Sequence, residues 1–170
     1  MIDLSGKVAL VTGSALGIGN GCAMELARCG ADLILNDRPG SKDLEPAAAE
    51  VRELGRECTA IEADVFSRPG CEQLVGGALK SCGRIDVLIS NPAFGKRMSF
   101  LDFDAGDFDR VTDATFKAGF HMSQLVARHM VERGGGGKII FISSVQAEMQ
   151  FARNLPYGAA KAAVNHMAQT

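Results

Sequence analysis

The sequence lacks the features that mark membrane-spanning, secreted and nucleic-acid-binding proteins. No apolar run in its 170 residues approaches the length needed to span a bilayer, and the first residues lack the charged start and apolar stretch of a signal peptide. Its 18 lysines and arginines are offset by 20 aspartates and glutamates, so no basic field would gather phosphate backbones or anionic lipids. We therefore expect a cytoplasmic protein that binds neither nucleic acid nor membranes.

The sequence also lacks the cysteine spacings of metal sites and of disulfide frameworks. Its 5 cysteines are odd in number and form neither a C-x-x-C pair nor a cluster with histidine. The 3 histidines fall on expected helices without a second ligand at a suitable distance. We expect reduced, structural thiols and no metal.

Hydrophobic residues make up 46% of the chain, which is enough for one substantial core. We find no internal repeat, low-complexity segment or linker. The sequence therefore predicts a single domain over residues 1–170.

Short apolar runs alternate with amphipathic segments along the whole chain. The runs predict strands and the 3.6-residue periodicity predicts helices, with Gly30, Gly55 and Gly83 where helices stop. Because alternation with short connections produces right-handed crossovers, we expect an α/β fold: a Rossmann-like, doubly wound parallel sheet with helices on both faces. The expected strands are 7–12, 31–36, 59–65, 85–90 and 138–143, and the expected helices are 18–29, 43–54, 67–81, 105–132 and one from 156 onward.

A glycine-rich segment joins the first expected strand to the first expected helix. Gly13, Gly17 and Gly19 permit a tight turn and a close approach of backbone to a ligand, while the helix start supplies free N–H groups and partial positive charge. The position of this segment between a strand and a helix predicts a pyrophosphate-binding loop. Many of the chain's other glycines are expected in ordinary turns and helix caps.

Asp37 ends the second expected strand. A carboxylate there accepts hydrogen bonds from both hydroxyls of an adenosine ribose and repels a 2′-phosphate, which favours NAD. The adjacent Arg38 attracts a 2′-phosphate instead, and Asp37 also fits the start of a turn before Pro39 and Gly40. NAD is therefore the preferred cofactor, with NADP as the alternative.

Tyr157, the only tyrosine, and Lys161 stand four residues apart just after Pro156. Proline is favoured in the first helical turn, so both side chains are expected on one helix face. Such a pair is usually an ordinary surface contact. A lysine cation nevertheless stabilises a phenolate, which would let Tyr157 exchange a proton with an alcohol or carbonyl.

With these residues assembled, the chain resembles the short-chain dehydrogenase/reductase family over essentially its whole length. Residues 12–19 look like the family's T-G-x-x-x-G-x-G loop, and residues 157–161 look like its Y-x-x-x-K motif. The resemblance implies cofactor contacts from Gly13, Ser14, Leu16, Gly17, Ile18, Gly19, Asp37, Arg38, Asp64, Val65, Asn91, Pro92, Ala93, Tyr157 and Lys161.

The same resemblance implies the catalytic roles. Tyr157 is expected to act as acid/base, Lys161 to hold the nicotinamide ribose and tune Tyr157, and Ser144 to bond the reacting oxygen. Thr115 completes the expected catalytic set. Hydride then passes between an NAD(P) nicotinamide and a small-molecule alcohol or carbonyl. The family also implies a homo-oligomer, a dimer or tetramer, with helices as its usual contact surface.

Three departures from the family pattern stand out. Pro92 stiffens a loop that is commonly N-N-A-G, and Thr115 stands where an asparagine usually organises a water-mediated proton path to the lysine. The family's last strands and its substrate loop have no counterpart, so we expect a fragment or truncated product. Residues 138–143 would then form an exposed sheet edge.

Two other functions stay open at this point. A catalytically silent nucleotide-binding or assembly module is compatible with Thr115 and the absent substrate region. An epimerase or dehydratase of the related extended group shares Y-x-x-x-K, but the spacing of Gly13, Gly17 and Gly19 argues against it. Sugar, polyol, oxoacyl and steroid alcohols are all compatible substrates.

Overall fold

The computed structural model describes residues 2–170 and contains one five-stranded sheet. Every neighbouring pair of strands is parallel, in the order β3-β2-β1-β4-β5. The chain order reverses on either side of β1, as expected for a doubly wound sheet. The strands are β1 (Val8–Val11), β2 (Asp32–Asp37), β3 (Cys58–Glu62), β4 (Val87–Ser90) and β5 (Lys138–Phe141).

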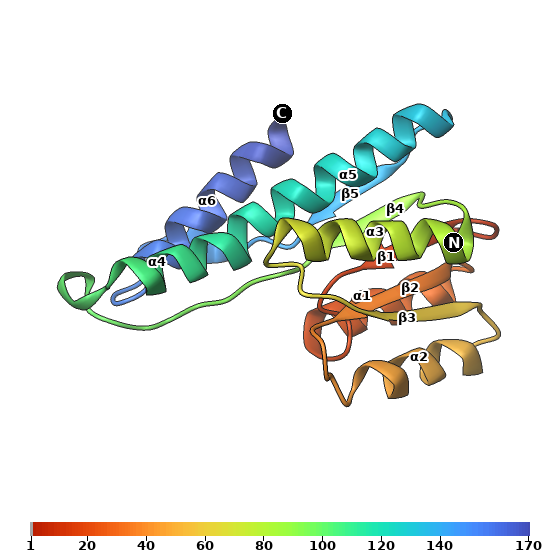
Figure 1. Cartoon of the computed structure of the whole chain (residues 1–170), viewed down its shortest axis with the longest axis horizontal. Helices are drawn as coiled ribbons and strands as arrows, with labels where there is room; N and C mark the ends of the chain where they lie inside the picture. Colours follow the sequence, from red (N-terminus) through yellow and green to blue (C-terminus); the bar gives the residue numbers. More distant parts are fainter. Residues whose placement is uncertain (1) are drawn as a thin grey trace.

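Helices follow the strands in the expected alternation, and Figure 1 shows them on both sides of the sheet. Helices α4 and α6 extend beyond the sheet toward the left of that view, while α5 runs along β5. The helices are α1 (Gly17–Arg28), α2 (Leu44–Glu53), α3 (Arg68–Cys82), α4 (Ala105–Thr112), α5 (Ala118–Arg133) and α6 (Leu155–Gln169), with short helical turns η1 (Phe100–Asp102), η2 (Asp113–Lys117) and η3 (Val145–Ala147).

Successive strand residues pack into two separate hydrophobic layers, because side chains on a strand alternate between the two faces of the sheet. Leu10 and Leu88 face a core formed with α3 and α5. Val11 and Ile89 face a second core formed with α1 and α2. The predicted Rossmann-like, parallel α/β fold is confirmed.

Two elements differ from the sequence prediction. The third strand ends at Glu62 rather than at Val65, since its partner β2 ends at Asp37, opposite Glu62. The long helix expected over residues 105–132 is divided by the π-helical turn η2, in which the N–H of Ala118 bonds the carbonyl of Asp113. One extra residue in the turn changes where the η2 side chains point.

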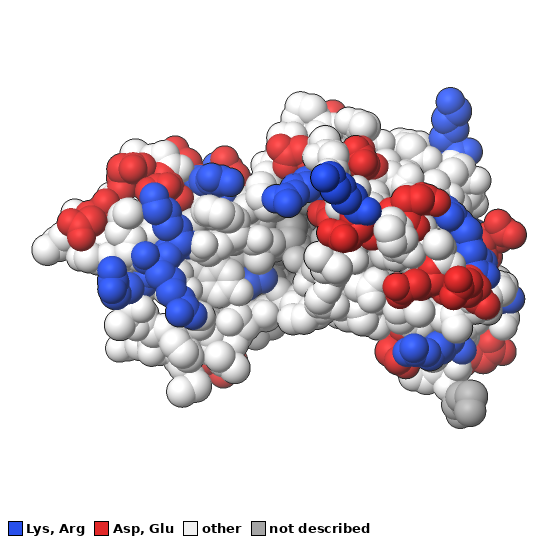
Figure 2. Space-filling view, turned by 90° about the horizontal axis from the view of Figure 1, so that it is seen from below, with Lys and Arg blue, Asp and Glu red and all other residues white. Residues whose placement is uncertain are grey.

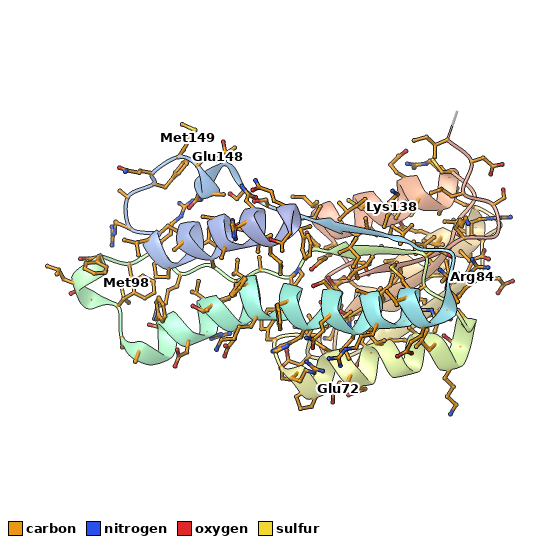
Figure 3. The ribbon with its side chains drawn as sticks, turned by 90° about the horizontal axis from the view of Figure 1, so that it is seen from above. Glu72, Arg84, Met98, Lys138, Glu148 and Met149 are labelled. Atoms are coloured by element: carbon orange, nitrogen blue, oxygen red, sulfur yellow. The ribbon has the colours of Figure 1, made fainter. Side chains whose placement is uncertain are left out.

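Asp86 ties several elements together at the edge of the sheet where the strands begin. Its carboxylate is 7% exposed and accepts hydrogen bonds from the Val8 N–H at 2.9 Å, from Arg84 at 2.7 and 2.8 Å, and from Arg133 at 2.9 Å. Burial opposes ionisation, but these donors and the two guanidinium charges hold the pKa of Asp86 at about 2. Figure 3 shows Arg84 and Lys138 at this end of the molecule.

The strand β5 lies at the edge of the sheet, as the sequence led us to expect if no further strand followed. Its side chains alternate between exposed and half-buried, and Ile140 is 47% exposed. All five cysteines are free thiols. Across residues 2–170, no helix combines the length and the apolar character needed to cross a lipid bilayer.

Candidate active site

A cleft of about 660 Å³ opens where strands β1 to β4 end. Its walls come from the loops that follow these strands, so residues far apart in the sequence meet in one place. Nine of the residues expected to bind a cofactor line it, namely Gly13, Leu16, Asp37, Arg38, Asp64, Val65, Asn91, Pro92 and Ala93.

The glycine loop, beside the start of α1, contributes Gly13 and Leu16 to the lining of this cleft. Gly13 and Gly17 have positive φ angles of 58° and 62°. Gly19 packs so closely that a Cβ there would lie 2.2 Å from the Gly13 carbonyl oxygen. No side chain caps α1, so its first N–H groups remain free to bind an anion. These features fit a dinucleotide pyrophosphate.

Six residues that were expected to contact the cofactor do not line this cleft, namely Ser14, Gly17, Ile18, Gly19, Tyr157 and Lys161. The Ser14 side chain is fully buried, where its hydroxyl donates to the Asn36 carbonyl at 3.2 Å and accepts the Asn36 N–H at 2.9 Å. Its hydroxyl therefore joins the loop to β2 instead of facing the cleft. Gly19 is buried against Gly13, and the Ile18 side chain is 64% exposed.

We expect Gly19→Ala to disrupt the glycine loop. The new methyl group would overlap the Gly13 carbonyl, so the loop must move, at a cost of about 1–3 kcal/mol in unfolding free energy, and NADH binding is expected to be lost. Gly21 is the matched control, because it also lies in α1 and nothing lies within 4 Å of an added Cβ. Gly21→Ala should raise stability by about 0.5–1 kcal/mol. Calorimetric titration and urea unfolding measure both effects, and equal NADH affinities for the two variants would contradict this interpretation.

Asp37 lies at the end of β2 on one side of the cleft. One carboxylate oxygen accepts the Arg38 N–H at 2.8 Å, and the other accepts the Ser41 hydroxyl at 2.7 Å. The turn itself closes through the Ser41 N–H and the Arg38 carbonyl, 3.2 Å apart. Both the ribose-binding and the turn-starting interpretations of Asp37 are therefore compatible with its position.

Asn91 connects the glycine loop to the end of β4. Its side-chain amide donates to the carbonyls of Thr12 at 3.2 Å and Gly13 at 3.1 Å, and its backbone N–H donates to the Thr12 hydroxyl at 3.0 Å. Pro92 is buried behind it and restricts the loop. Asn91 thus holds the two sides of the cleft at a fixed separation.

Thr115 lies in the π-helical turn η2 and is 2% exposed. Its hydroxyl donates to the Phe94 carbonyl at 3.0 Å and accepts the Phe94 N–H at 3.2 Å. A hydroxyl has one proton to donate, and here the Phe94 carbonyl takes it. The geometry therefore shows Thr115 fixing the loop after β4, which is a positioning contact.

Lys161 and Tyr157 lie close together at the start of α6, as their spacing predicted. The Lys161 ammonium nitrogen lies 5.8 Å from the centre of the Tyr157 ring and donates to the Ile142 carbonyl at 2.6 Å. The lysine is 3% exposed, and burial lowers its pKa to about 8. The bond to Ile142 holds α6 against the end of β5.

Ser144 follows β5 and begins the short turn η3. Its hydroxyl accepts the Gln146 N–H at 3.2 Å, and its own proton is bonded to no acceptor among residues 2–170. The hydroxyl of the neighbouring Ser143 is buried, and it forms no hydrogen bond with any of residues 2–170. Ser144, Tyr157 and Lys161 therefore gather around the carboxyl end of β5.

The lowered pKa of Lys161 should appear in the pH dependence of folding. The unfolded chain holds this proton up to about pH 10.5 and the folded chain only to about pH 8, so stability rises with pH across that window. Relative to Lys161→Met, the wild-type unfolding free energy should gain roughly 2 kcal/mol between pH 7.5 and 10. Urea titrations at several pH values measure this difference.

The effect of Lys161 on the pH dependence must be separated from that of the buried cysteines and from that of removing any lysine. Burial raises the pKa of Cys58 to about 12 and of Cys71 to about 11, which lowers stability above pH 9 in every variant and so cancels in the difference. The exposed Lys80 provides the control, and Lys80→Met should follow the wild-type slope. If the unfolding free energy of Lys161→Met rose with pH as steeply as that of wild type, the lowered pKa of Lys161 would be refuted.

Several cleft residues were not found from the sequence. Ser41, Lys42 and Asp43 belong to the segment after β2, Phe94 belongs to the loop after β4, and Arg110 belongs to α4. The Arg110 guanidinium stacks over the Phe94 ring at 4.2 Å. The turn residues could have been inferred from their distance to Asp37, but Arg110 comes from α4 and no motif marks it. Within residues 2–170, no group of three or more His, Cys, Asp and Glu side chains is arranged to hold a metal ion.

The profile of the short chain dehydrogenase family matches residues 7–170. The chain belongs to this family. Among curated members, 2-dehydro-3-deoxy-D-gluconate 5-dehydrogenase of Escherichia coli K12 is 36% identical over 164 residues, covering 95% of this chain. Gluconate 5-dehydrogenase of Gluconobacter oxydans is 36% identical over 167 residues, covering 98% of this chain.

Solved short-chain dehydrogenase structures show the same fold. A short-chain type dehydrogenase/reductase from Mycobacterium marinum superimposes with a TM-score of 0.94 at 31% identity, covering 98% of this chain and 66% of that one. A 7α-hydroxysteroid dehydrogenase solved in complex with NADH and 7-oxo glycochenodeoxycholic acid has a TM-score of 0.92 at 32% identity, over 98% of this chain and 64% of that one. The present chain spans 63% and 64% of the two curated relatives.

Proposed function

We propose that the chain belongs to an NAD(H)-dependent oxidoreductase that interconverts an alcohol and a ketone or aldehyde, with Tyr157 as acid/base. The observation that carries the proposal is the buried Lys161 ammonium beside the Tyr157 ring, at the end of the strand that leads to Ser144. Membership of an oxidoreductase family and relatives named for dehydrogenation of hydroxyl groups support it.

The glycine loop and cleft fit a dinucleotide. Its pyrophosphate would lie against the uncapped start of α1, its adenosine ribose near Asp37 and its adenine near Asp64 and Val65. Gly13, Leu16 and the loop at Asn91, Pro92 and Ala93 would continue the contact toward the nicotinamide. NAD is preferred because of the Asp37 carboxylate, and NADP is the alternative because Arg38 and Lys42 also line the cleft.

In the direction of reduction, Tyr157 donates its phenolic proton to the carbonyl oxygen as that oxygen gains charge. The Ser144 hydroxyl donates a hydrogen bond to the same oxygen. The Lys161 cation stabilises the phenolate left on Tyr157, and its remaining N–H groups would hold the nicotinamide ribose. A bound nicotinamide would supply the hydride in this direction and accept it in the reverse direction.

Thr115 has a supporting part in this proposal. Its hydroxyl fixes Phe94, and therefore the loop that carries Asn91 to Ala93 along the cleft. Because the Phe94 carbonyl takes its only proton, Thr115 contributes by positioning this loop. The same observation favours a second candidate, a catalytically silent nucleotide-binding or assembly module that lacks the family's usual proton path.

Calorimetric titration of the chain with NADH and NADPH, followed by a 340 nm assay with a panel of alcohols and ketones, tests these proposals. We expect micromolar NADH binding, weaker NADPH binding and measurable turnover. Binding without turnover on any substrate would support the silent module. A folded chain that binds neither cofactor would overturn the cofactor assignment.

A further inference from the structure

Asn36 is a buried polar residue at the candidate site, and none of the contacts proposed so far uses its side chain. It lies in β2 directly before Asp37 and is only 1% exposed. It is nevertheless one of the residues that line the cleft of about 660 Å³. Burying an amide is unfavourable unless its polar atoms find partners, so the partners of Asn36 indicate what the residue does.

The side-chain amide of Asn36 holds the segment that follows β3. Its Nδ2 atom donates to the carbonyls of Ile61 at 3.1 Å, Ala63 at 3.2 Å and Asp37 at 3.1 Å. Because all three neighbours are acceptors, only the NH2 group of the amide can face them. The Ala63 N–H donates in turn to the Asp37 carbonyl at 3.0 Å. The contacts between β2 and the third strand therefore continue past the end of β3, to the residue before Asp64.

The backbone of Asn36 holds the glycine loop in the same way. Its N–H donates to the Ser14 hydroxyl at 2.9 Å. Its carbonyl accepts the Ser14 N–H at 2.9 Å and the Ser14 hydroxyl at 3.2 Å. Asn36 is thus bonded to three walls of the cleft, namely the glycine loop, the segment after β2 and the segment after β3.

Charge alone does not determine how a dinucleotide would lie in this cleft. Three cationic side chains and three carboxylates line it and offset one another, namely those of Arg38, Lys42, Arg110, Asp37, Asp43 and Asp64. Figure 2 shows the same mixture over the half of the molecule that carries α2, where basic and acidic side chains lie next to one another. The position of the ligand must then depend on hydrogen-bonding groups in the loops, whose effect is sensitive to small displacements.

From these contacts we infer that Asn36 is a positioning residue for the adenosine half of the cofactor. It fixes the glycine loop, Asp37 and Asp64 relative to one another, and these are the groups proposed to surround the pyrophosphate, ribose and adenine. Its Oδ1 atom is buried without a partner among residues 2–170, a cost that an apolar residue at this place in the strand would avoid. The inference rests on the proposed function, because it concerns the cofactor site assigned there.

The test measures the affinities of the wild-type chain and of Asn36→Ala for AMP and for NADH by calorimetric titration. AMP occupies the adenosine half alone. Asn36→Ala removes both N–H donors and releases the segment after β3, so both affinities should fall by the same factor, at least about tenfold. A general loosening of the cleft would instead lower NADH affinity more than AMP affinity, since NADH also occupies the other half.

Two further variants complete the comparison. Asn36→Thr suits a strand and keeps one donor, so it should fold even if Asn36→Ala does not, and it should lose about threefold or more in AMP affinity. Asn154→Ala is the control. Asn154 is also buried, its amide donates to the Gln146 side chain at 2.7 Å, and its Oδ1 atom likewise has no partner within residues 2–170, but it does not line the cleft. Asn154→Ala should leave AMP affinity unchanged.

The outcomes separate this inference from the proposed function. Wild-type AMP affinity in a folded Asn36 variant, a larger loss for NADH than for AMP, or an equal AMP loss in Asn154→Ala would each overturn the role of Asn36 and leave the cofactor assignment intact. A folded wild-type chain that does not bind NADH would overturn the cofactor assignment, and the role of Asn36 with it.

Discussion

Phenylalanine in place of Tyr157 is expected to lower NADH-linked turnover by a factor of about 10² to 10⁴, because the substrate oxygen then has no acid or base to exchange a proton with. The ring itself remains, with its packing beside Gly95 and the Lys161 ammonium 5.8 Å away. NADH affinity and the urea midpoint should therefore stay at wild-type values. Steady-state kinetics at 340 nm and calorimetric titration measure the two effects separately.

Ser144→Ala provides a graded comparison for this experiment. It removes one hydrogen bond to the reacting oxygen and leaves the phenol in place, so its loss of turnover should be smaller than that of Tyr157→Phe. Wild-type turnover in Tyr157→Phe would exclude the assigned chemistry. Loss of NADH binding together with activity would instead show that Tyr157 has a structural part in the cofactor site.

Asp86→Asn is expected to have the largest effect on stability. The amide removes the buried negative charge that Arg84 and Arg133 share and replaces one acceptor with a donor. The guanidinium groups left without this partner are 40% exposed in Arg84 and 22% exposed in Arg133, so water compensates part of the loss and the cost should be about 2–4 kcal/mol. For a chain of this size the melting temperature should then fall by roughly 6–11 °C. Calorimetric melting and urea unfolding at pH 7 measure the loss.

The pH dependence identifies the cause of that loss. The pKa of Asp86 is about 2 in the folded chain against an ordinary 3.8, so its contribution is present above pH 3.8 and disappears as the pH falls toward 2. The difference in unfolding free energy between wild type and Asp86→Asn should therefore become smaller as the pH falls from 3.8 toward 2. Glu25→Gln breaks an exposed ion pair with Arg28 and should change stability by no more than about 1 kcal/mol. Similar losses in both variants at pH 7 would contradict the special role of Asp86.

The fold could be predicted from the sequence because its signals are local. Apolar runs, helical periodicity and the glycines that end helices define each element, and the short connections leave few alternatives to a parallel doubly wound sheet. The proximity of Tyr157 and Lys161 was predictable for the same reason, since a four-residue spacing on one helix determines it. Errors were confined to element ends and to η2.

The contacts that the sequence did not reveal all depend on residues far apart in the chain. Thr115 binds Phe94 across 21 positions, and Asp86 reaches Val8 across 78. Nothing next to Ser14 indicates that its hydroxyl turns toward Asn36 and away from the cleft. Such pairings follow only from how the loops pack once the sheet has formed. The free acceptor on Asn154 is likewise visible only when its surroundings are known.

The Asp86 cluster and the candidate site lie at opposite ends of the same parallel strands. Because all five strands run in one direction, the contacts that anchor the sheet gather where strands begin, and the exposed loops around the site follow where strands end. Figure 3 shows Arg84 at one end and Met98 and Met149 at the other. Substitutions in the loops around the site can therefore alter which molecule is recognised without breaking the Asp86 contacts. This separation lets substrate preference diversify while folding is conserved.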